Sequence, residues 1–163
     1  MAKYTAIVLS AGKGSRMGSS VHKQYLLLCG RPVIYYTLKA FEESPVDEIV
    51  LVTGEGEEEY CRKEIVEKYK LHKVTKIVKG GKERYHSVFQ GLSACEHTDY
   101  VLIHDGARPF IGQEVIRHTM DEVQKKHACI AAVPVKDTIK KVDENGKVED
   151  LSLIHISEPT RPY

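Results

Sequence analysis

The sequence predicts an α/β fold, with a mainly parallel sheet covered by helices on both faces. Short apolar runs alternate with longer amphipathic segments along the chain, which is typical of β-α-β units. The apolar runs lack a polar and apolar alternation, as residues 5–9 show, and this favours strands buried on both faces. Parallel crossovers are right-handed, so the loops that follow the strands gather at one sheet edge, where ligands of such folds bind.

The elements follow from these periodicities. Strands are expected at residues 5–9, 49–53, 74–78, 100–103 and 130–133. Helices are expected at residues 32–43, 57–70, 83–95 and 113–126. Pro32 suits a first helical turn because its missing N–H is not needed there. The acid-rich run 55–64 is interpreted as a solvated helix face, and Asn145-Gly146 predicts a hairpin turn that begins an extended β-arm.

Length and composition limit the function classes. A chain of 163 residues, 42% hydrophobic and 29% charged, is enough for one globular domain. The net charge of +1 argues against a general nucleic-acid or membrane-surface binder. No apolar run reaches the ~18–20 residues of a membrane span, and the N-terminus does not resemble a signal peptide, so a cytoplasmic location is expected. The four cysteines form no Cys-x-x-Cys pair, which disfavours a zinc or redox site.

The loop after the first strand carries the clearest chemical signal. It reads SAGKGSRMG over residues 10–18, and its glycines permit close approach of the backbone to a bulky anion. Lys13, Arg16 and Lys23 add cations, and no acidic residue occurs before residue 32. This combination fits a triphosphate, and the alternative is a flexible surface loop with solvated charges.

The spacing of this loop separates it from other phosphate-binding loops. No Lys-Ser or Lys-Thr follows a glycine at the distance that a P-loop requires. Met17 stands where a dinucleotide-binding loop has its third glycine, and the second strand ends Val52-Thr53-Gly54 without a ribose-binding acid. A nicotinamide-dependent dehydrogenase is therefore disfavoured.

Five short segments together resemble one enzyme family. They are AGKGSRMG (11–18), KQYL (23–26), GGKERYHSV (80–88), HDGARPF (104–110) and PVKDT (134–138). Among sugar-nucleotide pyrophosphorylases and cytidylyltransferases, they are most similar to the 2-C-methyl-D-erythritol 4-phosphate cytidylyltransferases. The resemblance implies a Rossmann-like, glycosyltransferase-A-like nucleotidyltransferase fold. It also implies transfer of CMP from CTP to 2-C-methyl-D-erythritol 4-phosphate, with release of pyrophosphate, in non-mevalonate isoprenoid precursor synthesis.

The same resemblance implies roles for individual residues. Arg16 and Lys23 match the two residues that stabilise the transition state, and Mg²⁺ or another divalent cation would bind together with CTP. The nucleotide would lie against Ser10, Ala11, Gly12, Gly14, Gly80, Gly81, Ser87 and Gly106. The Ser87 hydroxyl would read the cytosine, although it is alternatively a hydroxyl that serves the start of a helix.

The remaining assignments concern the metal, the ribose and the acceptor. Asp105 would lie beside the ribose and the metal or acceptor, or would be a structural carboxylate. Thr138 and Arg108 would face the acceptor phosphate, with Arg108 alternatively bracing its loop. Thr138 is often lent to a neighbouring subunit by the arm, so a homodimer is expected of the complete protein.

The C-terminal segment does not resemble the family. Residues 151–163 resemble the translation of a sequencing adapter and are expected to be non-native, which leaves residues 1–150 as an incomplete cytidylyltransferase domain. Such a fragment is expected to bind CTP with Mg²⁺ and to have weak or absent turnover. The alternatives are a ribitol 5-phosphate cytidylyltransferase and a non-catalytic CTP-binding fragment, and no nucleic-acid partner is expected.

Overall fold

The computed structural model describes residues 2–12, 22–133, 140–145 and 147–151. The chain forms two compact units, Met1–Cys129 and Ile130–Tyr163. The candidate site residues that are described all belong to the first unit.

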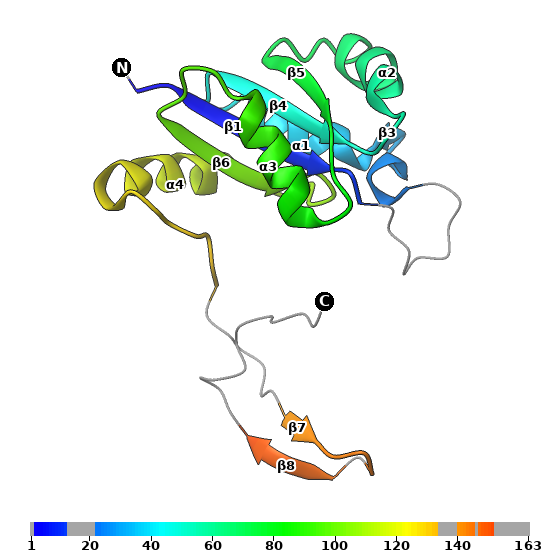
Figure 1. Ribbon diagram of the computed structural model, residues 1–163, viewed down its shortest axis with the longest axis vertical. Coiled ribbons are helices and arrows are strands. Elements are labelled where there is room, and N and C mark those ends of the chain that lie inside the picture. Colours follow the sequence, from blue (N-terminus) through cyan, green and yellow to red (C-terminus); the bar gives the residue numbers. More distant parts are fainter. Residues whose placement is uncertain (1, 13–21, 134–139, 146, 152–163) are drawn as a thin grey trace. The chain divides into compact units, whose positions relative to one another are not determined.

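A four-stranded sheet forms the centre of the first unit (Figure 1). Its strands are β1 (Tyr4–Ser10), β4 (Glu48–Thr53), β5 (Val74–Lys79) and β6 (Tyr100–Asp105). They lie in the order β5-β4-β1-β6, and each neighbouring pair is parallel. The central strand β1 is buried along its whole length, as its mostly apolar sequence without polar alternation predicts.

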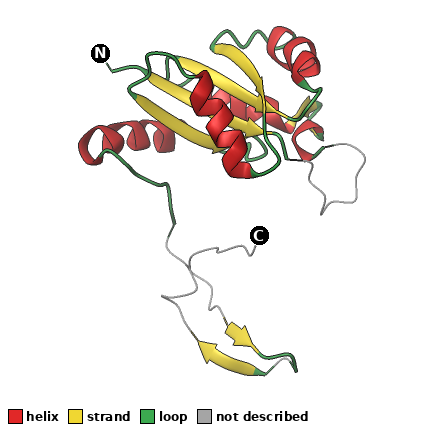
Figure 2. Ribbon diagram, in the orientation of Figure 1, coloured by secondary structure: helices red, strands yellow, loops and turns green. Residues whose placement is uncertain are grey.

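Helices cover both faces of this sheet, which confirms the expected fold class (Figure 2). One face packs against α1 (Val33–Glu42), η3 (Cys61–Glu67) and α4 (Gln113–Lys126). The other face packs against α3 (Arg84–Ala94), which lies over Ile7, Val50 and Val52. The sheet is therefore covered more completely on the first face than on the second.

Most expected elements are present, with shifted ends. The α4 bounds agree with the prediction, and α1 begins one residue later because Pro32 is its N-cap. The helix expected at 57–70 is a short α2 (Glu58–Tyr60) that continues as the π-helical η3. Three short elements were not anticipated: η2 (Lys23–Tyr25), β2 (Leu27–Leu28) and β3 (Arg31–Pro32).

The strand expected at residues 130–133 is wrong. These residues form no strand, and Ile130 and Val133 are 88% and 86% exposed. An apolar run becomes a strand only when a neighbouring edge accepts its backbone hydrogen bonds. Within the described residues, β6 pairs with β1 alone.

The second unit contains the expected hairpin. Strand β7 (Lys140–Val142) pairs antiparallel with β8 (Val148–Leu151). In the turn, Asp143 Oδ1 accepts hydrogen bonds from the amides of Asn145 and Lys147, at 2.9 and 2.7 Å. None of the helices in the described parts of either unit is long and apolar enough to cross a membrane.

Candidate functional site

The carboxyl ends of the four strands bring the predicted nucleotide loops to one sheet edge. In the register of the sheet, Ser10 pairs with Thr53 and Leu9 pairs with Asp105. On the other side, Thr53 pairs with Lys79. The residues that follow these strand ends are therefore neighbours in space, although they are far apart in the sequence.

Gly80 forms the closest junction between these loops. Its amide donates to the Thr53 carbonyl at 2.8 Å. A Cβ atom at Gly80 would lie 2.5 Å from Ala11 Cβ and 2.7 Å from Ser87 Oγ. Gly80 thus lies against both Ala11 and Ser87, two other predicted nucleotide-binding residues, and only glycine fits there.

The Ser87 hydroxyl ties the glycine loop to helix α3. Its oxygen accepts a hydrogen bond from the Gly81 amide at 3.1 Å, and it lies 3.4 Å from the Glu83 carbonyl, to which it donates. The side chain is buried, and the N-cap of α3 is Glu83 rather than Ser87. Ser87 therefore holds the loop in place from inside the first helical turn. A contact with cytosine stays a prediction.

The loop after β6 is fixed against β1 and α1. The Gly106 amide donates to the Leu9 carbonyl at 2.7 Å. The buried Thr37 hydroxyl of α1 lies 3.0 Å from the Gly106 carbonyl and 3.1 Å from the Arg108 carbonyl. These contacts set the position of Asp105 at the strand end.

Two guanidinium groups share the Asp105 carboxylate. Arg84 Nη2 lies 3.1 Å from Oδ1, and Arg108 Nη2 lies 3.0 Å from Oδ2. One carboxylate between two guanidinium groups leaves one excess positive charge in this cluster, which favours an anionic ligand. The ion pair between Arg108 and Asp105 lies within one loop, and both interpretations of Arg108 stay predictions. Arg84 received no role from the sequence, although it stands inside the GGKERYHSV segment.

The turn η2 presents Lys23 to solvent. Gln24 next to it is buried and donates through Nε2 to the Ser10 carbonyl at 2.7 Å. Lys23 itself is exposed, and its ammonium makes no ion pair within the described segments. The turn is therefore held at the end of β1 while its cation stays available.

Several predicted residues have less structural support. Arg16, Gly14 and Thr138 lie outside the described residues. A Cβ at Gly12 would meet nothing within 4 Å. The Ser10 hydroxyl is buried and has no hydrogen-bond partner in the described part of the chain.

The interpretation of the acid-rich run as a solvated face is wrong for Glu57. Its carboxylate is 17% exposed and contacts Tyr25, His22 and the Gly54 amide. The spacing of acids in the sequence contains no signal for this, because Tyr25 is 32 residues away in the chain and His22 belongs to the same distant segment.

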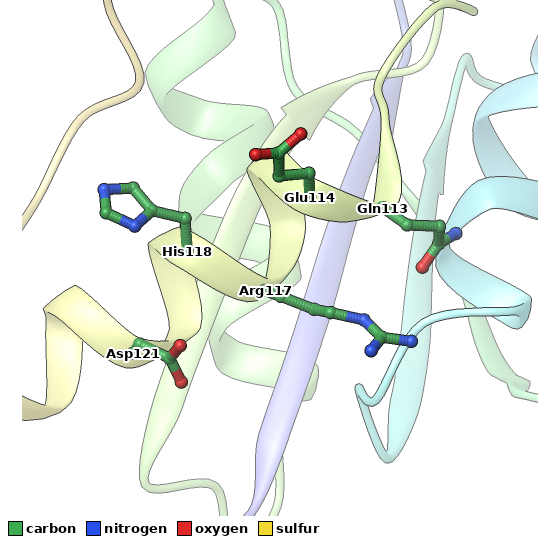
Figure 3. Close-up of a pocket in the computed structure, with 5 residues that line it drawn as sticks. All are labelled: Gln113, Glu114, Arg117, His118 and Asp121. Carbon is green, nitrogen blue, oxygen red and sulfur yellow. The ribbon is translucent and has the colours of Figure 1, made fainter.

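The structure also contains a shallow depression along α4, away from the predicted residues. Its lining side chains all project from that one helix (Figure 3): Gln113, Glu114, Arg117, His118 and Asp121. Gln113 donates to the Ala40 carbonyl at 2.6 Å. Charges of both signs on one helix face, without a converging second element, do not define a ligand.

Comparison with known proteins identifies similar chains. Residues 4–152 match the family model described as IspD, 2-C-methyl-D-erythritol 4-phosphate cytidylyltransferase. A protein of that name from Lachnoclostridium phytofermentans is 51% identical over 149 residues, which are 91% of this chain and 64% of the relative. One from Alkaliphilus metalliredigens is 52% identical over 148 residues, 90% of this chain and 61% of the relative.

Solved structures agree with this similarity. The crystal structure of 4-diphosphocytidyl-2C-methyl-D-erythritol synthase from Anaerococcus prevotii has a TM-score of 0.76 and 32% identity, and the match covers 92% of this chain and 63% of that one. The chain spans less than two thirds of the length of the curated relatives quoted above.

Proposed function

The chain belongs to the 2-C-methyl-D-erythritol 4-phosphate cytidylyltransferase family, and we propose that it binds CTP and transfers CMP to 2-C-methyl-D-erythritol 4-phosphate. Pyrophosphate is the second product, and the reaction serves isoprenoid precursor synthesis. The observation that supports this most directly is the junction of Ala11, Gly80 and Ser87. It joins two glycine loops at the sheet edge that also carries Asp105 and the Lys23 turn.

The proposed reaction is an in-line displacement. A phosphate oxygen of the acceptor attacks the α-phosphorus of CTP, a new P–O bond forms, and the bond to pyrophosphate breaks with its electron pair leaving on pyrophosphate. Negative charge is concentrated on the phosphoryl oxygens, so catalysis consists mainly of positioning and electrostatic stabilisation. Lys23 supplies a mobile point charge and Arg16 a forked guanidinium for these oxygens.

The nucleotide and the acceptor would use different loops. In this proposal, the backbone approaches CTP at five glycines: Gly12, Gly14, Gly80, Gly81 and Gly106. Three other residues would lie beside them: Ser10, Ala11 and Ser87. Arg108 and Thr138 would face the acceptor, with Thr138 supplied by a second copy in a homodimer. A cytoplasmic location and the lack of a nucleic-acid partner stay predictions.

The predicted site residues supply few ligands for a divalent cation. Within the described residues, no three His, Cys, Asp or Glu side chains form a metal cluster. Mg²⁺ commonly uses one or two carboxylates together with substrate phosphates, and Asp105 is the carboxylate among the predicted site residues. Bound there with CTP, Mg²⁺ would neutralise part of the triphosphate charge.

The rival functions are less well supported. The quoted curated relatives are named for the methylerythritol enzyme, so the ribitol 5-phosphate alternative is not favoured. A non-catalytic CTP-binding fragment is an outcome of the test below. We also propose that residues 151–163 are non-native, which the reading frame after Asp150 in the source DNA would test.

Replacement of Lys23 tests the function. Lys23→Ala should lower kcat by about 100- to 1,000-fold, as the loss of one transition-state contact does, while CTP affinity falls by less than about tenfold. Pyrophosphate release gives kcat and calorimetric titration gives the affinity. Lys63→Ala, which removes an exposed lysine paired with Glu59, is the matched control. CTP binding without acceptor-dependent turnover in the unmodified chain would favour the non-catalytic alternative.

A further inference from the structure

Glu57 lies where the loop after β4 meets the Lys23 turn. Its Oε2 accepts hydrogen bonds from the Tyr25 hydroxyl at 2.8 Å and the Gly54 amide at 3.1 Å. Its Oε1 lies 2.5 Å from His22 Nδ1. One carboxylate therefore connects three backbone segments: the residue before η2, the end of η2, and the end of β4.

The backbone at Gly54 makes this arrangement possible. A Cβ atom at Gly54 would lie 2.8 Å from Glu57 Oε2 and 2.9 Å from its Cδ. Any other residue there would push the carboxylate away from its partners. The glutamate thus occupies a place that the loop leaves open for it.

The surroundings of the carboxylate are partly closed to water. The Tyr25 hydroxyl also lies 3.1 Å from the Sγ atom of Cys61, whose side chain is fully buried. Burial, assisted by the adjacent Cys61 and Glu57, raises the pKa of Tyr25 above its usual value, so its hydroxyl stays a donor. The ring of Tyr25 is flanked by His22 at 6.3 Å and by Tyr60 at 5.1 Å between centroids.

The consequence concerns Lys23, which lies between the two residues that Glu57 holds. Gln24 fixes the same turn from the other side through the Ser10 carbonyl. A lysine has a flexible four-carbon stem, so its charge is delivered to a defined place only if its backbone is fixed. His22 and Tyr25 on one side and Gln24 on the other supply that restraint.

We propose that Glu57 is a positioning residue that, through Tyr25 and His22, fixes the turn from which Lys23 reaches the phosphates. This rests on the proposed function, because Lys23 acts there on CTP. Glu57 itself touches neither substrate nor reacting atoms in this role.

Three substitutions test the proposal in the full chain. Glu57→Gln keeps an acceptor for Tyr25 and Gly54 but removes the charge beside His22. Tyr25→Phe removes one donor, and Gly54→Ala displaces the carboxylate while leaving its charge. Glu64→Gln is the matched control, because Glu64 is an exposed glutamate that pairs with Lys68 along the same helical segment.

The expected result is a split between kcat and KM. Misplacing a catalytic group by about 1 Å costs about 100-fold in rate, so kcat should fall by about 10- to 100-fold in the three variants. KM for CTP should stay within about threefold, and amide hydrogen exchange in residues 22–28 should be faster than in Glu64→Gln. A lower melting temperature with kcat unchanged would show a merely structural role and would overturn the proposal.

Failure of the proposed function has a different signature. If the unmodified chain does not turn CTP over, whether or not it binds CTP, the proposed transfer fails for this chain, and hydrogen exchange alone decides whether Glu57 restrains the turn. Exchange in residues 22–28 that equals that of Glu64→Gln would then overturn it, whereas faster exchange in all three variants would support the restraint on the turn.

Discussion

At the scale of single residues, the candidate site depends on Gly80, because its lack of a side chain leaves room for the residues around it. Gly80 has no side chain, and the space a Cβ would need is taken by Ala11 Cβ, Ser87 Oγ and the Thr53 carbonyl, at 2.5, 2.7 and 3.2 Å. Because one neighbour is backbone and another is a short side chain, none can move aside cheaply.

Gly80→Ala should therefore open the loop junction. We expect a loss of about 1–3 kcal/mol in the free energy of unfolding, the usual cost of overpacking, together with weaker CTP binding. Urea denaturation and calorimetric titration measure the two effects. Gly12→Ala is the stability control, since its Cβ would meet nothing within 4 Å, and an equal loss of stability in both variants would contradict the argument.

His104 makes the stability of the chain depend on pH. Burial lowers its pKa from the usual 6.5, and Arg108 acts in the same direction, although Asp105 opposes both. Its ring packs edge-on against Phe41 at 5.4 Å. The folded chain thus prefers the neutral imidazole, whose stabilisation is present above about pH 6.5 and is lost as the pH falls through the folded pKa.

The expected outcome is a falling urea midpoint between pH 7.5 and pH 5, with a smaller fall in His104→Phe. The phenyl ring keeps the contact with Phe41 and cannot be protonated. His118→Gln, at an exposed position on α4, serves as the comparison. A pH dependence in His104→Phe as steep as that of the unmodified chain would remove His104 as its source.

At the scale of elements, helix α1 holds the loop that carries Asp105. The Thr37 hydroxyl of α1 lies within hydrogen-bond distance of the Gly106 and Arg108 carbonyls. Thr37→Val keeps the shape and removes this donor. Leaving the buried Gly106 carbonyl without this donor should cost about 1–3 kcal/mol of stability, and the loosened loop should weaken CTP binding.

Thermal unfolding and CTP titration measure these two effects. Thr119→Val is the control, because the Thr119 hydroxyl donates to the Val115 carbonyl within its own helix. If Thr37→Val behaves like Thr119→Val, the hydroxyl does not support the loop.

The helices and strands also show which features of the fold the sequence predicts. The run Tyr100–Asp105 pairs with β1 as a strand, while residues 130–133, which are all apolar, form none. Likewise α4 has the predicted bounds, where apolar positions recur with helical spacing. Local pattern predicts an element well only when a partner surface is also present.

At the scale of the whole molecule, the two sheet faces of the first unit differ in their cover. Among the described helices of this unit, α3 is the one that packs on the second face, and it exposes Tyr85, Phe89 and Leu92, at 63%, 65% and 41%. Ile103 of β6 is 42% exposed. Apolar side chains gathered on one helix favour association with other apolar surfaces.

Phe89→Ser should accordingly reduce self-association, as measured by sedimentation velocity at several concentrations. Its free energy of unfolding should stay within about 0.5 kcal/mol, as for an exposed position. Phe41→Ser is the contrasting variant: Phe41 is 1% exposed, and its truncation should cost about 3–5 kcal/mol. Unchanged self-association in Phe89→Ser would show that α3 is not the contact surface.

The sequence alone determined the α/β class, the four strands of the central sheet with the main helices that follow them, and the glycine and cation signals of the strand-end loops. These features depend on periodicity and on the conformational freedom of glycine, which are local properties of the chain. Only the tertiary structure decided that Ala11, Gly80 and Ser87 meet, that two arginines share Asp105, and that Glu57 holds the Lys23 turn. Such contacts depend on strand register and on loops that lie far apart in the chain, because packing, not spacing, brings their side chains within reach of each other.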